Sequence, residues 1–270
     1  MLVAQLDELR IEAWLAQKGP KYSCPNCSEQ VTLKKGRLVI HHFAHQPGAH
    51  CSWASGETRE HMHAKRHLAE GLQQRGLQVE IEKCVLSLAG DRRADLLLTN
   101  GAGNSVAIEI QHTPIDYEGI ERRTKAYVAA NIPVAWVGIL TEHMKGEMAR
   151  RGKGYVISKF SPRPWQKWVH AYNFKEIWFV DPENGELWRG EMTTHMHEVA
   201  SSEWYNEYGE EQSAGGYVRH SKRWRDLSLE GPFQAANIQL SCPRRNKPWS
   251  GGRMNLPVGR FLRFTGPASN

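Results

Sequence analysis

Two carboxylates and an amide occur at spacings that suit metal-assisted hydrolysis. In residues 105–111 apolar residues alternate with others, and this period of two indicates a strand with Glu109 and Gln111 on one face. Residues 93–99 predict a second, mostly apolar strand that carries Asp95, and the turn-forming residues between the strands fold them into a hairpin. Asp95 and Glu109 then lie side by side. Neighbouring carboxylates repel each other without a cation, so the hairpin predicts a site for Mg²⁺ or Mn²⁺.

A helix predicted over residues 55–75 brings further polar side chains toward these carboxylates. Steps of four residues place Glu57, His61 and Lys65 on one stripe, which continues into two leucines and is therefore the buried face. Glu57 is a candidate third metal ligand, and His61 is a candidate to transfer protons or to hold Glu57. The alternative for both segments is a solvated edge hairpin and a surface helix whose polar residues do no chemistry.

A second metal site is predicted near the N-terminus. Cys24 and Cys27 form a CxxC turn, and a short predicted hairpin separates them from several histidines and a third cysteine. The expected ligands of a structural Zn²⁺ are Cys24, Cys27, His45 and Cys51, with His42 as the alternative for one of the last two. The competing interpretation is a redox CxxC with solvent-exposed histidines.

The elements after the hairpin complete an α/β core. Asp116 is suited to cap a helix that runs to about Ala130, in which Arg123 and Tyr127 share a face. We expect Arg123 to clamp a phosphate and Tyr127 to stack on or hydrogen-bond to nucleic acid, and Arg93 is a further candidate for nucleic-acid contact. With a buried apolar strand after this helix, the predicted order is a helix, a three-strand meander, a helix and a strand.

The C-terminal third has a different composition. A hairpin is predicted around Asn184 and Gly185, and beyond it no clear periodicity remains. Tryptophans and tyrosines there interleave with arginines and lysines, a composition suited to stacking on bases and holding phosphates, with Arg223 and Arg225 as candidate nucleic-acid ligands. The alternative is a partly disordered tail or an extension that docks a partner.

Length and charge limit the classes of protein that fit. The chain has 270 residues, with 35 Lys and Arg against 29 Asp and Glu, and this mild basic surplus favours a polyanionic partner. No apolar run reaches the length of a membrane span and no signal peptide is visible, so we expect a cytoplasmic protein without membrane contact. Five cysteines, an odd number that includes one CxxC, suit a reducing compartment.

The metal hairpin resembles the PD-(D/E)xK nuclease core. Asp95 stands for its first acidic residue, and Glu109 to Gln111 stand for its (D/E)xK strand. That superfamily usually carries Lys where this chain has Gln111. We hypothesise that Lys65 supplies this charge from the helix, so that Lys65 and Gln111 together orient the attacking water.

The joint order of six motifs looks like the competence protein CoiA family over roughly residues 20–180. In chain order these are the CxxC pair, the His/Cys cluster, the Glu-His-Lys helix, Asp95, the Glu109–Gln111 strand, and Arg123 with Tyr127. The resemblance implies a zinc-finger-like segment, a nuclease domain and a role in processing or recombining incoming DNA. It also implies that Gln111 is that family's own variant.

We therefore expect a Mg²⁺- or Mn²⁺-dependent deoxyribonuclease that acts on DNA, with recombination or defence proteins as further partners. The alternatives are a non-catalytic DNA-binding accessory to recombination or competence, and an RNA-directed or defence-associated nuclease. The expected parts are a lead-in at 1–19, a zinc-ribbon-like knuckle at 20–55, a PD-(D/E)xK nuclease-like domain at 56–190, and a basic, Trp-rich extension at 191–270.

Overall fold

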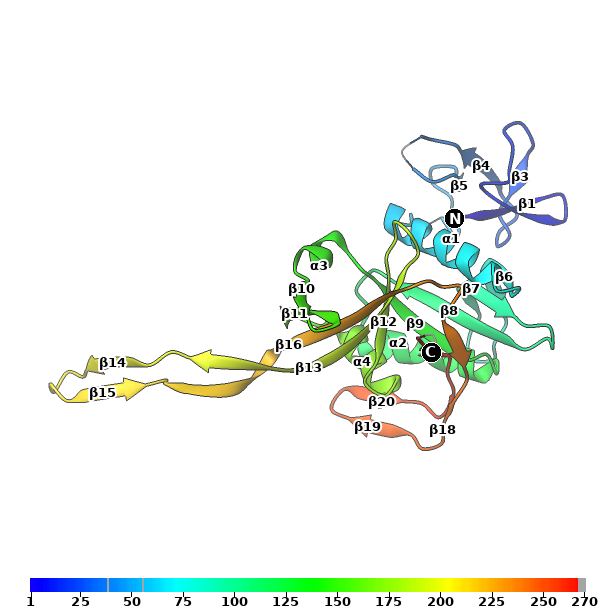
Figure 1. Cartoon of the computed structure of the whole chain (residues 1–270). Helices are drawn as coiled ribbons and strands as arrows, with labels where there is room; N and C mark the ends of the chain where they lie inside the picture. Colours follow the sequence, from blue (N-terminus) through cyan, green and yellow to red (C-terminus); the bar gives the residue numbers. More distant parts are fainter. Residues whose placement is uncertain (38, 55, 267–270) are drawn as a thin grey trace.

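The N-terminal strands form a small antiparallel sheet of their own, the blue lobe in Figure 1. The computed structural model describes residues 1–37, 39–54 and 56–266. The sheet has the order β2-β1-β3-β4-β5, with β1 (Val3–Leu6), β2 (Leu9–Glu12), β3 (Tyr22–Ser23), β4 (Gln30–Lys34) and β5 (His42–His45). The predicted boundary between a lead-in at 1–19 and a knuckle at 20–55 is wrong, because β1 pairs with β3 across it. We call residues 1–54 the N-terminal module.

The central sheet begins with the elements that the sequence predicts. In chain order they are α1 (Arg59–Gln73), β6 (Gln78–Val85), β7 (Arg92–Thr99), β8 (Ser105–Gln111), α2 (Tyr117–Ala129) and β9 (Val134–Ile139). β6, β7 and β8 form an antiparallel meander, and β9 lies parallel to β8. The predicted order of a helix, a three-strand meander, a helix and a strand is confirmed. The side chains of Thr58 and Asp116 cap α1 and α2, which explains where both helices begin.

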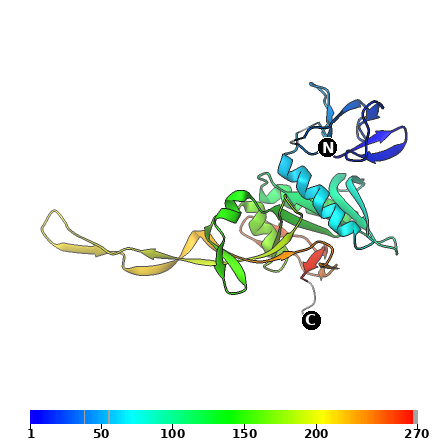
Figure 2. The same cartoon turned by 45° about the horizontal axis from the view of Figure 1, so that its top comes forward.

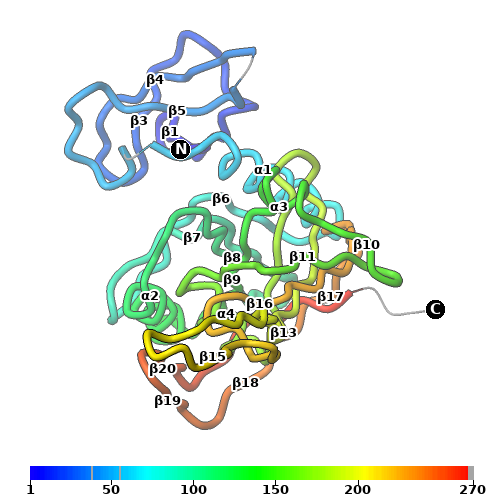
Figure 3. The backbone as a smooth tube through the Cα atoms, turned by 90° about the vertical axis from the view of Figure 1, so that its left-hand side faces the viewer, coloured from blue at the N-terminus to red at the C-terminus, as the bar shows by residue number. Residues whose placement is uncertain are grey.

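Helices cover both faces of this sheet. α1 packs on one face through Leu68 and Leu72, whereas α2 and α4 (Pro164–Tyr172) pack on the other. The strand residues divide accordingly, since Ile108 belongs to the core under α1 and Ala107 to the core under α2. Because both faces are covered, β9 is buried along its whole length. Figure 3 shows the N-terminal module as a lobe above α1 and β6.

The sheet continues beyond β9 to nine strands in the order β10-β11-β16-β13-β12-β9-β8-β7-β6. The added elements are α3 (Glu142–Gly146), β10 (Ala149–Arg151), β11 (Gly154–Phe160), β12 (Ile177–Val180), β13 (Leu187–Val199) and β16 (Tyr217–Phe233). The hairpin predicted around Asn184 and Gly185 is confirmed, because this turn joins the antiparallel pair β12 and β13. Gly185 has a φ of 74°, a backbone conformation that favours glycine.

β13 and β16 extend past the edge of the body as a two-stranded ribbon, which Figures 1 and 2 show projecting far from the rest of the chain. A second hairpin of β14 (Ser202–Tyr205) and β15 (Glu211–Ala214) forms its far end. We call residues 192–225 the arm. The predicted separation of an extension at residue 191 is wrong, because β13 runs without a break from the sheet into the arm.

Residues 234–266 fold back onto the body in short strands. These are β17 (Gln239–Ser241), β18 (Arg244–Arg245), β19 (Trp249–Gly251), β20 (Met254–Leu256), β21 (Gly259–Arg260) and β22 (Arg263–Thr265). Phe264 joins the core under α1 and Phe261 joins the core under α2. The predicted partial disorder is therefore wrong for residues 191–266. Residues 267–270 of the predicted extension, and residues 38 and 55 of the predicted knuckle, lie outside the described residues.

In the described ranges no helix is both long enough and apolar enough to cross a bilayer.

Candidate functional site

Four cysteine and histidine side chains meet beside the small sheet. Ligand atoms of Cys24, Cys27, His45 and Cys51 all lie within 4.8 Å of one another. The Sγ atoms of Cys24 and Cys51 are 3.9 Å apart, and Cys27 Sγ is 3.4 Å from His45 Nε2. Three thiols and an imidazole so placed are a donor set that fits tetrahedral zinc. His42 lies outside this group, with its Nδ1 2.9 Å from a backbone carbonyl oxygen.

Asp95 and Glu109 line one pocket of about 410 Å³, which we call the carboxylate pocket. The ladder between β7 and β8 ends at the pair of Leu96 and Ile108, and Asp95 and Glu109 are the next residues along their strands. Asp95 Oδ2 accepts the backbone N–H of Ile110 at 2.8 Å, where a ladder hydrogen bond to a backbone carbonyl would otherwise form. The end of the ladder therefore brings both predicted carboxylates to the same opening.

Lys65 of α1 is the centre of a buried ionic cluster. Its Nζ lies 2.8 Å from both carboxylate oxygens of Glu57, 2.5 Å from Glu82 and 3.8 Å from Asp95. The side chain has no exposed surface. Lys65 offsets the negative charge of three acids that would otherwise repel one another, and its role in orienting water stays a prediction.

Sequence reasoning missed Glu82. This residue has a positive φ of 55°, which interrupts the alternation of β6. Its carboxylate is completely buried, and the oxygen that does not bind Lys65 accepts the backbone N–H of Leu2 at 3.0 Å. The available signal was Lys65 itself, because a lysine on a buried stripe needs acidic partners.

His61 connects the lysine cluster to the carboxylate pocket. Its Nε2 is 3.3 Å from Asp95 Oδ2, and its Nδ1 is 3.7 Å from Glu57 Oε1. One ligand atom from each of Glu57, His61 and Asp95 lies within 4.8 Å of the other two. Glu109 is not a member of this group of described residues, although it lines the same pocket as Asp95.

The charges of this group follow from its neighbours. Burial alone would raise the pKa of Asp95, but His61 and Lys65 outweigh burial and lower it. Burial likewise opposes ionisation of Glu57, yet Lys65 lowers the pKa of Glu57 to about 2. Burial would lower the pKa of His61, but Asp95 raises it above the usual value. The carboxylates of Asp95 and Glu57 are therefore ionised at neutral pH, as ligands of a divalent cation must be.

Glu109 is held from the opposite face of the sheet by α2. Arg123 Nη2 donates to Glu109 at 2.6 Å, and Arg123 Nη1 donates to Gln111 Oε1 at 3.2 Å. The cation beside Gln111 is therefore Arg123 and not Lys65. The hydroxyl of Tyr127 donates to the other oxygen of Glu109, and because this residue is fully buried, its predicted contact with nucleic acid is wrong. Burial raises the pKa of Glu109 even though Arg123 and Tyr127 oppose the shift.

The N-terminal module forms one wall of the carboxylate pocket. Asn26, Ser52 and Trp53 line it, and each lies within two residues of a cysteine of the zinc-type cluster. The Asn26 amide donates to Cys51 Sγ at 3.3 Å. Arg93, which also lines this pocket, stacks on Trp53 with 4.6 Å between the guanidinium carbon and the ring centroid. The pocket is thus shared by the two parts of the chain, a contact that the sequence did not predict.

Arg223 and Arg225 lie at the base of the arm and do not line the carboxylate pocket. Between them, the Trp224 ring has the Arg223 guanidinium at 5.8 Å and Lys159 Nζ at 5.6 Å from its centroid. Arg225 Nη1 donates to the carbonyl oxygens of Ser221 and Trp224, so one side of this guanidinium is occupied by the arm's own backbone.

Two family models match the chain. Residues 57–213 match the nuclease-like domain of competence protein CoiA, and residues 4–54 match the N-terminal domain of competence protein CoiA. The two matched ranges meet where the small sheet ends and α1 begins. No curated protein and no solved structure matches the chain.

Proposed function

This chain belongs to the competence protein CoiA family, and from that premise we propose that it is a divalent-metal-dependent nuclease that hydrolyses phosphodiester bonds in DNA. The observation that carries the proposal is the placing of Asp95 and Glu109 in one pocket, with His61 3.3 Å from Asp95. Arg93 and Arg123 line the same pocket and supply the positive charge that a phosphate backbone requires.

We assign the core to the PD-(D/E)xK type. The order of α1, the meander β6 to β8, α2 and β9 supports this assignment, as does the position of the two acids where the ladder between β7 and β8 ends. In this assignment Asp95 is the first acid and Glu109 with Gln111 is the second motif. Arg123 takes the place of the charge that a lysine at position 111 would bring.

Glu57, His61 and Asp95, whose ligand atoms lie within 4.8 Å of one another, would hold Mg²⁺ or Mn²⁺, with Glu109 of the same pocket as a further candidate ligand. Their carboxylate and imidazole donors fit an ion of this class, and Mn²⁺ tolerates imidazole together with carboxylates. A divalent ion bound there supplies Lewis-acid chemistry and lowers the pKa of water.

Two basic side chains of the protein hold the acidic residues of this site in position. Lys65 prevents repulsion among Glu57, Glu82 and Asp95, and Arg123 holds Glu109 from the opposite side of the sheet. Because the Arg123 guanidinium is partly exposed at the pocket, it can also contact a phosphate oxygen in the transition state.

A cleavage assay tests the proposal. Purified protein is incubated with single-stranded, duplex and flapped DNA and with RNA, in Mg²⁺ and in Mn²⁺, alongside Asp95→Asn and the matched control Glu60→Gln on the exposed face of α1. We expect cleavage of DNA that falls by about 100-fold in Asp95→Asn, since a metal contributes several kcal/mol of transition-state stabilisation. Glu60→Gln should cleave like the parent. Equal cleavage by Asp95→Asn, or no cleavage by the parent, would reject the nuclease.

A second candidate is a DNA-binding accessory to recombination or competence that does not cleave. The ammonium of Lys65 already lies among three acids, and position 111 carries an amide in place of a lysine, which favours this candidate. For this candidate, the cleavage assay should give no products in either metal, although the protein still binds DNA. Preferred cleavage of RNA would instead favour the RNA-directed or defence-associated nuclease.

A further inference from the structure

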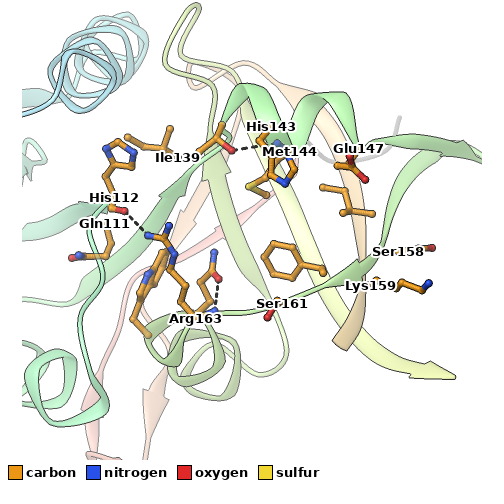
Figure 4. A pocket seen from close by; sticks show the side chains of 15 residues that line it. Gln111, His112, Ile139, His143, Met144, Glu147, Ser158, Lys159, Ser161 and Arg163 are labelled. Carbon is orange, nitrogen blue, oxygen red and sulfur yellow. Dashed lines mark hydrogen bonds between the residues drawn. The ribbon is translucent and has the colours of Figure 1, made fainter. Parts of the chain in front are cut away.

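A second pocket has a volume of about 490 Å³ (Figure 4). Its walls come from the ends of β8 and β9, the start of α3, the strand β11 and the start of α4. Gln111 lines it, and we call it the Gln111 pocket. Arg123 joins the two pockets, because it donates to Gln111 in one and to Glu109 in the other. A molecule in the Gln111 pocket would therefore lie next to the proposed cleavage site.

The lining of the Gln111 pocket combines an apolar floor with a basic rim. Trp165 and Ile157 are buried in the floor, and Phe160 is half-buried beside them. Of the described residues that line this pocket, only Glu147 is acidic. Arg163 Nη1 donates to the backbone oxygen of His112 at 3.0 Å, a neutral acceptor that leaves the guanidinium charge free for an anion.

Size restricts what can enter. A pocket of about 490 Å³ has the volume of a small-ligand site, so it can hold one nucleotide but not a base pair with its two backbones. Removing a base from its stack costs free energy. Enzymes that act on single nucleotides offset this cost by stacking the base on an aromatic or apolar surface. A guanidinium at the rim is suited to the attached phosphate.

We propose that the Gln111 pocket binds one unstacked nucleotide of the strand being cut, with its base against Phe160 and its phosphate at Arg163. This inference rests on the proposed nuclease function and defines its substrate class: single-stranded DNA, or a frayed or flapped end, rather than continuous duplex. Lys159 on β11 lines the same pocket, and its ammonium lies over the Trp224 ring at the base of the arm. Lys159 therefore connects the pocket to the arm.

The test measures binding separately from cleavage. All proteins carry Asp95→Asn and no divalent metal is added, so that no strand is cut. Affinity for a fluorescent single-stranded oligonucleotide and for a blunt hairpin duplex is measured for Phe160→Ala, for Arg163→Ala and for the control Arg150→Ala, an exposed arginine on β10 that does not line this pocket. Thermal unfolding checks each fold, and Phe160→Leu removes the aromatic ring while keeping most of its volume.

We expect Phe160→Ala and Phe160→Leu to weaken single-strand binding by about 5-fold or more, the usual loss for a stacked base. Arg163→Ala should reduce the slope of log affinity against log salt by about 0.7, the value for one phosphate contact on a single strand. Duplex affinity and the Arg150→Ala control should not change. Parent-like single-strand binding by the pocket variants, or equal losses on single strand and duplex, would overturn the inference.

The cleavage assay keeps the two proposals apart. If the pocket variants lose single-strand affinity but the parent cleaves nothing in Mn²⁺, the nuclease proposal fails and the nucleotide-binding pocket stands. If the parent cleaves DNA and the pocket variants bind the single strand normally, the nuclease proposal stands and the nucleotide-binding pocket fails.

Discussion

Lys65 is charged in a place that water does not reach. Burial alone would lower the pKa of its ammonium, but Glu82, Glu57 and Asp95 together raise it above the usual value. The ammonium of Lys65 and the carboxylates around it are therefore all charged, and the stability of the cluster depends on keeping the cation and the anions together. A buried ion pair of this kind is costly to break because the partner charges are then left uncompensated.

Lys65→Met should consequently lower the free energy of unfolding by about 3–5 kcal/mol. Urea denaturation followed by circular dichroism measures the loss. Lys83→Met provides the control, because Lys83 makes only a partly exposed pair with Glu80 and should cost about 1 kcal/mol or less. Addition of Glu82→Gln to Lys65→Met should recover part of the stability. Equal midpoints for the two lysine variants would show that the cluster does not stabilise the fold.

For single residues, the sequence predicted where a side chain lies better than it predicted what that side chain does. Alternation along β8 placed Glu109 and Gln111 correctly on one face, because a strand's period of two depends only on local backbone geometry. The role of Tyr127 was not predictable, because spacing on a helix tells which face a hydroxyl is on but not whether a carboxylate or a ligand receives it. Glu82 escaped because a single residue with positive φ reverses the face that the alternation would assign.

Among the elements, α4 anchors the base of the arm. His170 of α4 accepts the backbone N–H of Met192 in β13 through its Nε2 at 3.1 Å, which requires the neutral imidazole. Burial, together with the positive charges of Lys175 and Arg225, lowers the pKa of His170 to about 4. The folded protein therefore resists protonation of this group, whereas the unfolded chain takes up the proton near the ordinary histidine value.

The stability that depends on neutral His170 is complete above pH 6.5 and decreases as the pH falls from 6.5 toward 4, because the unfolded state gains the proton first. We expect the loss of unfolding free energy between pH 7.5 and pH 5.0 to be smaller in His170→Gln, whose amide oxygen can still accept the hydrogen bond. Chemical denaturation of both proteins at both pH values measures it. The same loss in parent and variant would contradict this assignment.

Element prediction succeeded where apolar spacing was regular and failed where it was not. The meander and both helices follow from periodicity and from the caps Thr58 and Asp116. β17 to β22 contain only two or three residues each, too few for a period to be visible. Along the arm, exposed residues lie on both faces, so the ribbon lacks the apolar alternation by which strands are recognised.

In the whole molecule, the N-terminal module and the nuclease-like domain share the carboxylate pocket. Asn26 and Trp53 contribute to its wall, and both donate N–H groups to Cys51 Sγ at 3.3 Å. A zinc ion bound by this cluster would hold that wall in place. The module is therefore expected to affect nucleic-acid binding through the geometry of the pocket and not only as a separate binding unit.

Cys24→Ser should remove the zinc, of which we expect about one per chain in the purified parent, because a structural site needs its four ligands. Elemental analysis measures the metal, and fluorescence anisotropy should show weaker binding of single-stranded DNA as the pocket wall loosens. Cys242→Ser is the control, since this cysteine lies outside the cluster. Full zinc content in Cys24→Ser would exclude Cys24 as a ligand.

The arm and the central sheet share continuous backbones. β13 is bonded to β12 in the body and to β16 along the ribbon, and β12 in turn is the parallel neighbour of β9. A pull along the arm therefore loads the hydrogen bonds between β13 and β12, and between β16 and β11, in shear, where many must yield together. Because the two strands of the arm are also strands of the sheet that carries Glu109, a force applied to the arm would be transmitted to that sheet.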